Sequence, residues 1–224
     1  AKKWVDENPN ADIRILSTGF SRGAEQAAGF TRLVEERGIQ NPTNAVVRRN
    51  ADGLIIGEVI YPNPPLREPG TVVQAVGLLD PVGTGAPRQH DRRLAESVIS
   101  GFQINALHDR RNLFQGTWII DPGMTPDGRF LNVSVAGAHT DIGGGYRRDG
   151  LGVLSGNLAI DYINALIRPP PLEKRALPND PDQYVVHRSE EHAFFHRTSI
   201  YDRNGERGMR ELLAPPSLCR IDCR

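Results

Sequence analysis

The sequence has no run of about 18 apolar residues, which excludes a helix long and apolar enough to span a membrane. Its first residues also lack the apolar stretch of a signal peptide. The sequence also has no excess of charge of one sign, because 27 basic residues balance 27 acidic ones. The net charge therefore does not favour nucleic acid as a partner. The chain does not begin with Met, and we expect it to be a piece of a longer protein.

Cysteine is scarce, with only Cys219 and Cys223 near the end of the chain. They are either two free thiols on a loose tail or a local disulfide, and the sequence leaves both open. Without a neighbouring histidine they do not form a zinc site. The glycine run at residues 143–145 lacks the Lys-Ser/Thr ending of a phosphate-binding loop. We therefore expect neither a metal nor a cofactor.

The 224 residues, of which 38% are hydrophobic, suit one domain with a full core. The candidate helices are residues 2–9, 24–37, 94–107 and 151–167, and the candidate strands are residues 13–17, 54–60, 72–79, 117–120 and 130–137. Strands and helices alternate over residues 10–168, which predicts an α/β fold with a doubly wound parallel sheet. We expect residues 1–168 to form this core and the Pro-rich residues 169–224 to form a C-terminal extension packing on it.

A sharp turn carries the first chemical signal. Residues 19–23 read GFSRG and match the G-x-S-x-G nucleophile elbow, in which a serine sits on a strained turn between a strand and a helix. Small residues are expected on both sides of Ser21, where strand and helix nearly touch. The backbone N–H of Arg22 would donate to the oxyanion of an acyl-transfer reaction. The alternative is a glycine-rich turn with an incidental, exposed Ser21.

A serine nucleophile needs a base, and the base needs an orienting carboxylate. Asp80 follows the apolar run 72–79 and His139 follows the run 130–137, in the chain order Ser, acid, His. Asp109 and Asp141 are rivals for the acid, although Asp141 is expected to order its own loop. The remaining histidines are interpreted as structural or surface residues; they are His90, His108, His187, His192 and His196.

Four blocks of the sequence resemble one known family. They are GFSRGA at residues 19–24, LDPVG at 79–83, DRRNLF at 109–114 and GAHTDIGGGY at 137–146. They resemble the α/β-hydrolase domain family that includes type VI secretion phospholipase effectors, over roughly residues 15–168. The resemblance implies a three-layer α/β-hydrolase-like sheet and a catalytic triad of Ser21, Asp80 and His139. It also implies hydrolysis of lipid esters, often phospholipids in the manner of phospholipases A1 and A2.

The resemblance also implies partners and a location. The substrate would be a phospholipid or another lipid ester, reached by peripheral membrane contact, and a cognate immunity protein would neutralise the enzyme. The protein would be a bacterial secreted effector acting on target-cell membranes from the periplasm, or would reside in the cytoplasm of the producer.

Two features depart from the family. Its members open with a strand ending in an Asp-Gly-Thr-type motif, whereas this chain starts 20 residues before Ser21. We therefore expect early strands of the sheet to be missing, together with the second oxyanion-binding N–H. Pro81 also follows Asp80 where the family commonly has threonine.

Two other functions remain open on the sequence. One is a non-catalytic, hydrolase-like binding module, and the other is an esterase acting on a soluble small-molecule ester.

Overall fold

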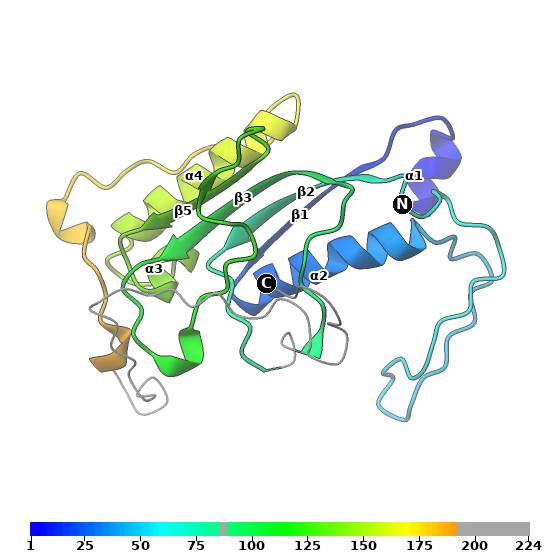
Figure 1. The fold of residues 1–224 in the computed structure, drawn as a ribbon, viewed down its shortest axis with the longest axis horizontal. Helices are drawn as coiled ribbons and strands as arrows, with labels where there is room; N and C mark the ends of the chain where they lie inside the picture. The colour runs from blue at the N-terminus through cyan, green and yellow to red at the C-terminus, as the bar shows by residue number, and fades with distance from the viewer. Residues whose placement is uncertain (86–88, 192–224) are drawn as a thin grey trace.

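The computed structural model describes residues 1–85 and 89–191. Its centre is a five-stranded sheet with the order β1-β2-β3-β5-β4 (Figure 1). The strands are β1 Arg14–Phe20, β2 Val73–Leu79, β3 Val98–Ala106, β4 Gly123–Met124 and β5 Phe130–Val135. The pairs β1–β2, β2–β3 and β3–β5 are parallel, and β4 pairs antiparallel with β5. The chain thus has an α/β-type fold. His192, His196, Cys219 and Cys223 lie outside the described residues.

Helices cover both faces of the sheet (Figure 1). They are α1 Lys2–Glu7, α2 Arg22–Arg37, α3 His139–Gly143 and α4 Gly150–Leu166, with short 3-10 turns at Asn112–Phe114, Pro181–Gln183 and Ser189–Glu191. Ala24, Ala27 and Ala28 of α2 pack against one face of β2 and β3. On the other face, Phe102 and Ile104 of β3 pack with Ile142 of α3, and Tyr162 of α4 packs against them. The predicted helices 24–37 and 151–167 are confirmed to within two residues.

The prediction of a helix over residues 94–107 is wrong. Residues 98–106 form the central strand β3 instead, hydrogen-bonded to β2 and β5. A strand covered on both faces does not alternate apolar and polar residues, so its pattern resembles that of a buried helix. Gly101 leaves room for the Phe130 ring on the neighbouring strand, because a Cβ there would lie 2.7 Å from Cδ1 of Phe130.

The prediction of a strand over residues 117–120 is also wrong, although the segment is buried. Three of its backbone groups bind side-chain amides, and Thr117 N donates to Pro81 O at 2.9 Å instead of to a strand. Gln103 Nε2 donates to Thr117 O at 2.8 Å, Ile120 N donates to Gln103 Oε1 at 3.0 Å, and Asn132 Nδ2 donates to Ile120 O at 2.6 Å. These amides satisfy backbone groups that would otherwise be buried without partners. Amide side chains of β3 and β5 thus make hydrogen bonds that a neighbouring strand would otherwise make.

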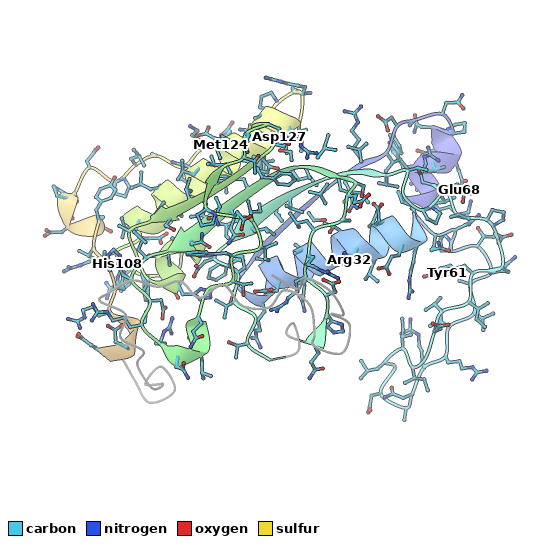
Figure 2. The ribbon with its side chains drawn as sticks, in the orientation of Figure 1. Arg32, Tyr61, Glu68, His108, Met124 and Asp127 are labelled. Atoms are coloured by element: carbon cyan, nitrogen blue, oxygen red, sulfur yellow. The ribbon has the colours of Figure 1, made fainter. Side chains whose placement is uncertain are left out.

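The candidate strand at residues 54–60 is not formed either. The chain between α2 and β2 instead projects from the body as a long arm, residues 44–61, with Tyr61 near its base (Figures 1 and 2). Isolated bridges Val46↔Ile60 and Arg49↔Ile55 hold its two sides together. Its large apolar side chains are exposed; they are Val46, Val47, Leu54, Ile55, Ile56, Ile60 and Tyr61.

The described part of the C-terminal extension runs along α4. Asn157 Nδ2 donates to Arg175 O at 2.9 Å, and Asn164 Nδ2 donates to Leu172 O at 2.8 Å. In the described residues, no helix is long and apolar enough to cross a membrane.

Replacing Ile104 with alanine tests the reassignment of β3. Ile104 is 0% exposed and Ile99 on the same strand is 48% exposed. We expect Ile104→Ala to lower the free energy of unfolding by about 2–5 kcal/mol, because it leaves a cavity in the core. The matched change Ile99→Ala should cost less than about 1 kcal/mol. Denaturant unfolding of both variants measures this, and equal losses would contradict the assigned strand.

Candidate active site

Ser21 lies on the sharp turn between β1 and α2, as the elbow motif predicts. Its φ of 59° places it in the left-handed region, where side chains other than glycine are rare. A bond from Ser21 N to Leu79 O at 2.9 Å ties the turn to the end of β2. A Cβ on Gly19 would lie 2.2 Å from Gly23 O, so strand and helix approach too closely there for any side chain. The expectation that Gly23 also lacks space is wrong, because a Cβ at Gly23 would meet no atom within 4 Å.

Asp80 follows β2 directly and is fully buried. Its φ of 40° is also in the left-handed region. Ala106 N, at the end of the neighbouring strand β3, donates to Asp80 Oδ1 at 2.9 Å. The other carboxylate oxygen, Oδ2, lies 2.6 Å from Nδ1 of His139. Both oxygens therefore have partners from elements outside β2.

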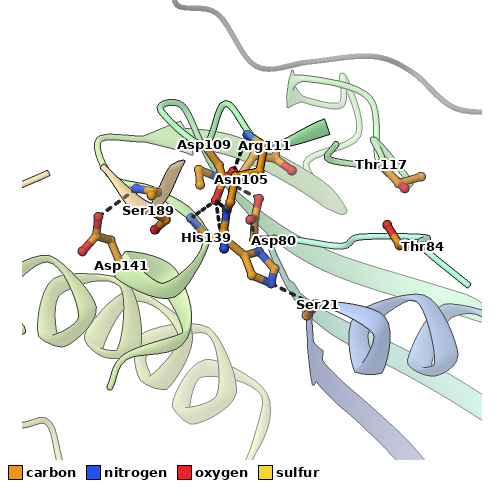
Figure 3. Close-up of polar contacts among 12 residues, drawn as sticks. Ser21, Asp80, Thr84, Asn105, Asp109, Arg111, Thr117, His139, Asp141 and Ser189 are labelled. Atoms are coloured by element: carbon orange, nitrogen blue, oxygen red, sulfur yellow. Dashed lines mark hydrogen bonds and ion pairs between the residues drawn. The ribbon is translucent and has the colours of Figure 1, made fainter. Parts of the chain in front are cut away.

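His139 is the first residue of α3, just past β5. Its Nδ1 faces Asp80, and its Nε2 lies 2.8 Å from Oγ of Ser21. Figure 3 shows the three side chains in one hydrogen-bonded series, contributed by the carboxyl ends of β1, β2 and β5. The structure thus brings together the three residues that the sequence analysis selected.

Two aromatic rings enclose the imidazole. Phe20 stacks on His139 with ring centroids 4.4 Å apart, and Phe114 meets it edge-on at 5.1 Å. Arg111 in turn lies over the Phe114 ring at 3.5 Å, and Gly143 leaves room for Phe20, which a Cβ there would approach to 2.4 Å. The rings restrict rotation of the imidazole about its side-chain bonds. This role was not predicted from the sequence, although Phe20 and Phe114 lie within the blocks at residues 19–24 and 109–114.

Backbone strain is concentrated at this site. Among the described non-glycine residues, only Ser21, Asn44 and Asp80 have positive φ. Such conformations cost about 1–3 kcal/mol each and persist where the surroundings enforce them, often at functional sites. Two of the three strained residues belong to the hydrogen-bonded series.

The arrangement is suited to proton transfer. A carboxylate at Asp80 accepts the Nδ1–H of His139, which leaves the Nε2 lone pair directed at the hydroxyl of Ser21. Arg22 is the first residue of α2, and the amide groups of a helix's first turn have no acceptor within the helix. Its N–H can therefore receive a negative charge that develops beside Ser21.

The rival residues lie close by and bind the backbone beside His139 rather than its ring. Asp109 Oδ2 accepts from His139 N at 3.1 Å, and Asp141 Oδ2 accepts from Ala138 N at 2.8 Å. His108 Nδ1 accepts from Gly137 N at 3.1 Å. Asp141 thus orders its own turn, as expected.

The other described histidines stand apart from the Ser21 hydroxyl. His187 pairs with Asp141, and His90 is exposed on a loop. The glycines after His139 end α3, where Gly144 is the C-cap with φ of 77°. In residues 1–85 and 89–191, no group of three or more His, Cys, Asp or Glu side chains could hold a metal ion.

Paired glycine substitutions test the elbow. Gly19→Ala should lower the free energy of unfolding by about 1–3 kcal/mol and displace Ser21, because the new methyl group collides with Gly23 O. Gly23→Ala should keep the turn and stabilise α2 by up to about 1 kcal/mol. Thermal unfolding and labelling of Ser21 by a fluorophosphonate probe measure both effects. Similar behaviour of the two variants would refute the close approach at Gly19.

Comparisons with known proteins find similarity among solved structures alone. A scan against protein-family models finds no match, and neither does a search of curated proteins. Among solved structures, the chain is similar to an uncharacterized protein from Pseudomonas aeruginosa, with 20% sequence identity and a TM-score of 0.46. The similarity covers 84% of this chain and 29% of that protein, so the chain spans less than a third of its length.

Proposed function

We propose that the protein is a serine esterase that cleaves lipid esters, in particular phospholipids at an A1 or A2 position, through an acyl-enzyme. One observation carries the proposal, namely the continuous hydrogen-bonded series from Ser21 Oγ through the His139 ring to the buried carboxylate of Asp80. A serine hydroxyl is a weak nucleophile alone, and this series supplies both a base and the group that orients it.

The proposed reaction gives each group of the series one role. Ser21 Oγ attacks the ester carbonyl carbon while His139 Nε2 takes the hydroxyl proton. Asp80 holds the imidazole in the required tautomer and stabilises the imidazolium. The Arg22 N–H donates to the oxyanion. His139 then gives its proton to the departing alcohol, and a water molecule activated by His139 releases the fatty acid and restores Ser21.

The lipid substrate and the α/β-hydrolase-like character of the fold rest on the four sequence blocks. The elbow block contains Ser21, and the blocks at 79–83 and 137–146 contain Asp80 and His139. The exposed apolar side chains of the arm, residues 44–61, also offer a surface that lipid could contact. The same resemblance leads us to propose a bacterial effector that attacks target-cell membranes and is neutralised by an immunity protein.

Replacing the nucleophile tests the chemistry. Ser21→Ala should reduce ester hydrolysis by on the order of 10⁴-fold or more, because no covalent intermediate can form, and should leave thermal unfolding nearly unchanged. Ser17→Ala, on the same strand β1, is the control and should hydrolyse esters like the parent protein. A fluorophosphonate probe should label Ser21 in the parent protein. Absence of labelling would instead support a non-catalytic binding module, whereas full hydrolysis by Ser21→Ala would refute Ser21 as the nucleophile.

A comparison of substrates tests the lipid assignment. Phospholipid vesicles should be hydrolysed with a higher kcat/KM than short soluble esters such as p-nitrophenyl acetate, and Ser21→Ala should abolish both activities. Fatty-acid release and p-nitrophenol release measure the two reactions. Hydrolysis of the soluble ester alone would contradict the lipid assignment while leaving the serine mechanism intact.

A further inference from the structure

The turn that leads into His139 is held by side chains at every amide. Gly137 N donates to His108 Nδ1 at 3.1 Å, Ala138 N donates to Asp141 Oδ2 at 2.8 Å, and His139 N donates to Asp109 Oδ2 at 3.1 Å. Three successive backbone N–H groups thus end on three different side chains. Ala138 is the N-cap of α3, and its bond to Asp141 belongs to a capping box. The bonds of Gly137 N and His139 N to side chains lie outside that motif.

The acceptor on one side, Asp109, is fixed by a buried ion pair. Arg111 binds its carboxylate through both Nε and a terminal nitrogen, the latter at 2.6 Å, and both side chains are almost completely buried. The same Arg111 lies over the Phe114 ring that touches His139. This pair therefore contacts the catalytic residue through its backbone and, by way of Phe114, through its ring.

The acceptor on the other side, Asp141, is fixed by the C-terminal extension. His187 Nδ1 lies 2.6 Å from Asp141 Oδ1, and His187 N donates to Asp141 Oδ2 at 3.0 Å. Tyr146 stacks on the His187 ring at 3.7 Å, and the Tyr146 hydroxyl bonds to Ser189 Oγ at 2.5 Å. A segment nearly 50 residues downstream of His139 thus holds the turn from which His139 projects.

The turn itself has little freedom to compensate. Gly137 has φ of 131°, and a Cβ there would lie 2.6 Å from Cβ of Asp141, so the carboxylate packs directly on the backbone. Loss of an acceptor leaves a buried amide without a partner, and the turn must move to find another. Any such movement carries the imidazole of His139 with it.

We propose that His108, Asp109 and Asp141 are positioning residues, which set the distance between His139 and Ser21 by fixing the backbone of residues 137–139. The proposal rests on the proposed function, since it assigns these residues a role in the reaction of Ser21. It also gives a role to Asp109 and Asp141, the two other candidates for the acid. Their carboxylates bind the backbone at His139 and Ala138 rather than the imidazole ring.

The test uses pairs of substitutions that remove or keep one acceptor. Asp141→Ala removes the carboxylate, whereas Asp141→Asn keeps an oxygen for Ala138 N and His187 N. His108→Leu removes the acceptor of Gly137 N, whereas His108→Asn places an amide oxygen where Nδ1 stood. Asp109 is left intact, because its loss would leave the buried guanidinium of Arg111 without its carboxylate.

The expected result is a loss of kcat that the conservative variants restore. Asp141→Ala and His108→Leu should lower kcat for a soluble ester by about 10- to 100-fold with KM within about twofold, because a displacement of about 1 Å costs roughly that much. Asp141→Asn and His108→Asn should stay within about threefold of the parent. Asp127→Asn and His90→Ala are the controls. Asp127 lies at the opposite end of the sheet from His108 (Figure 2), and His90 is on an exposed loop.

A second measurement is independent of turnover. His139 Nδ1 lies 2.6 Å from Asp80 Oδ2, and we expect a proton in this hydrogen bond to give a far-downfield resonance that reports the position of the ring. We expect this resonance to shift or vanish in Asp141→Ala and to remain in Asp141→Asn. If Asp141→Ala and His108→Leu fold and keep both the parent kcat and this resonance, the positioning role is refuted. If the resonance responds as expected but Ser21 of the parent protein is never labelled, the positioning stands and the proposed function fails.

Discussion

The hydrogen bond between Asp80 and His139 is the contact on which the rest of the site depends. Burying a carboxylate costs several kcal/mol unless hydrogen bonds and opposite charge compensate for the lost water. Asp80 is fully buried, and its partners come from the end of β3, through Ala106 N, and from α3, through His139. These partners meet only when β2, β3 and β5 are parallel neighbours with their carboxyl ends aligned. The requirement to satisfy one carboxylate therefore links the register of the sheet to the geometry of the site.

The two strained turns support one another. Ser21 N donates to Leu79 O, the residue before Asp80, and Val82 N donates back to Ser21 O at 3.3 Å. Neither turn would be expected to keep its left-handed residue in isolation, because each such residue costs free energy. Bonded together across the edge of the sheet, the serine turn and the acid turn form a rigid platform. In the proposed reaction, such a platform would keep His139 Nε2 at hydrogen-bond distance from Ser21 Oγ, so that little reorganisation would be needed.

Periodicity predicted the elements that have one clear apolar face, such as α2 and α4, and the uninterrupted run of β2. It wrongly predicted a strand over residues 117–120, where the side-chain amides of Gln103 and Asn132 donate to backbone carbonyl groups that a neighbouring strand would otherwise bind. The site residues were predictable because each follows a candidate strand, in the order Ser, acid, His that the elbow pattern implies. Their enclosure by Phe20 and Phe114 was not, since ring contacts depend on tertiary packing.

A repeated local pattern shows why neighbours in space decide a residue's role. In both Asp109-x-Arg111 and Asp127-x-Arg129 the aspartate accepts from the backbone N–H and the guanidinium of the arginine two residues later. At the exposed Asp127, a hydrogen bond from the hydroxyl of Thr125, followed by those from Arg129, lowers the pKa to about 2. The buried pair at Asp109 makes the same local bonds, but its carboxylate also reaches the amide of His139. Spacing along the chain therefore specifies the turn, whereas the fold determines that one of these turns lies beside the candidate base.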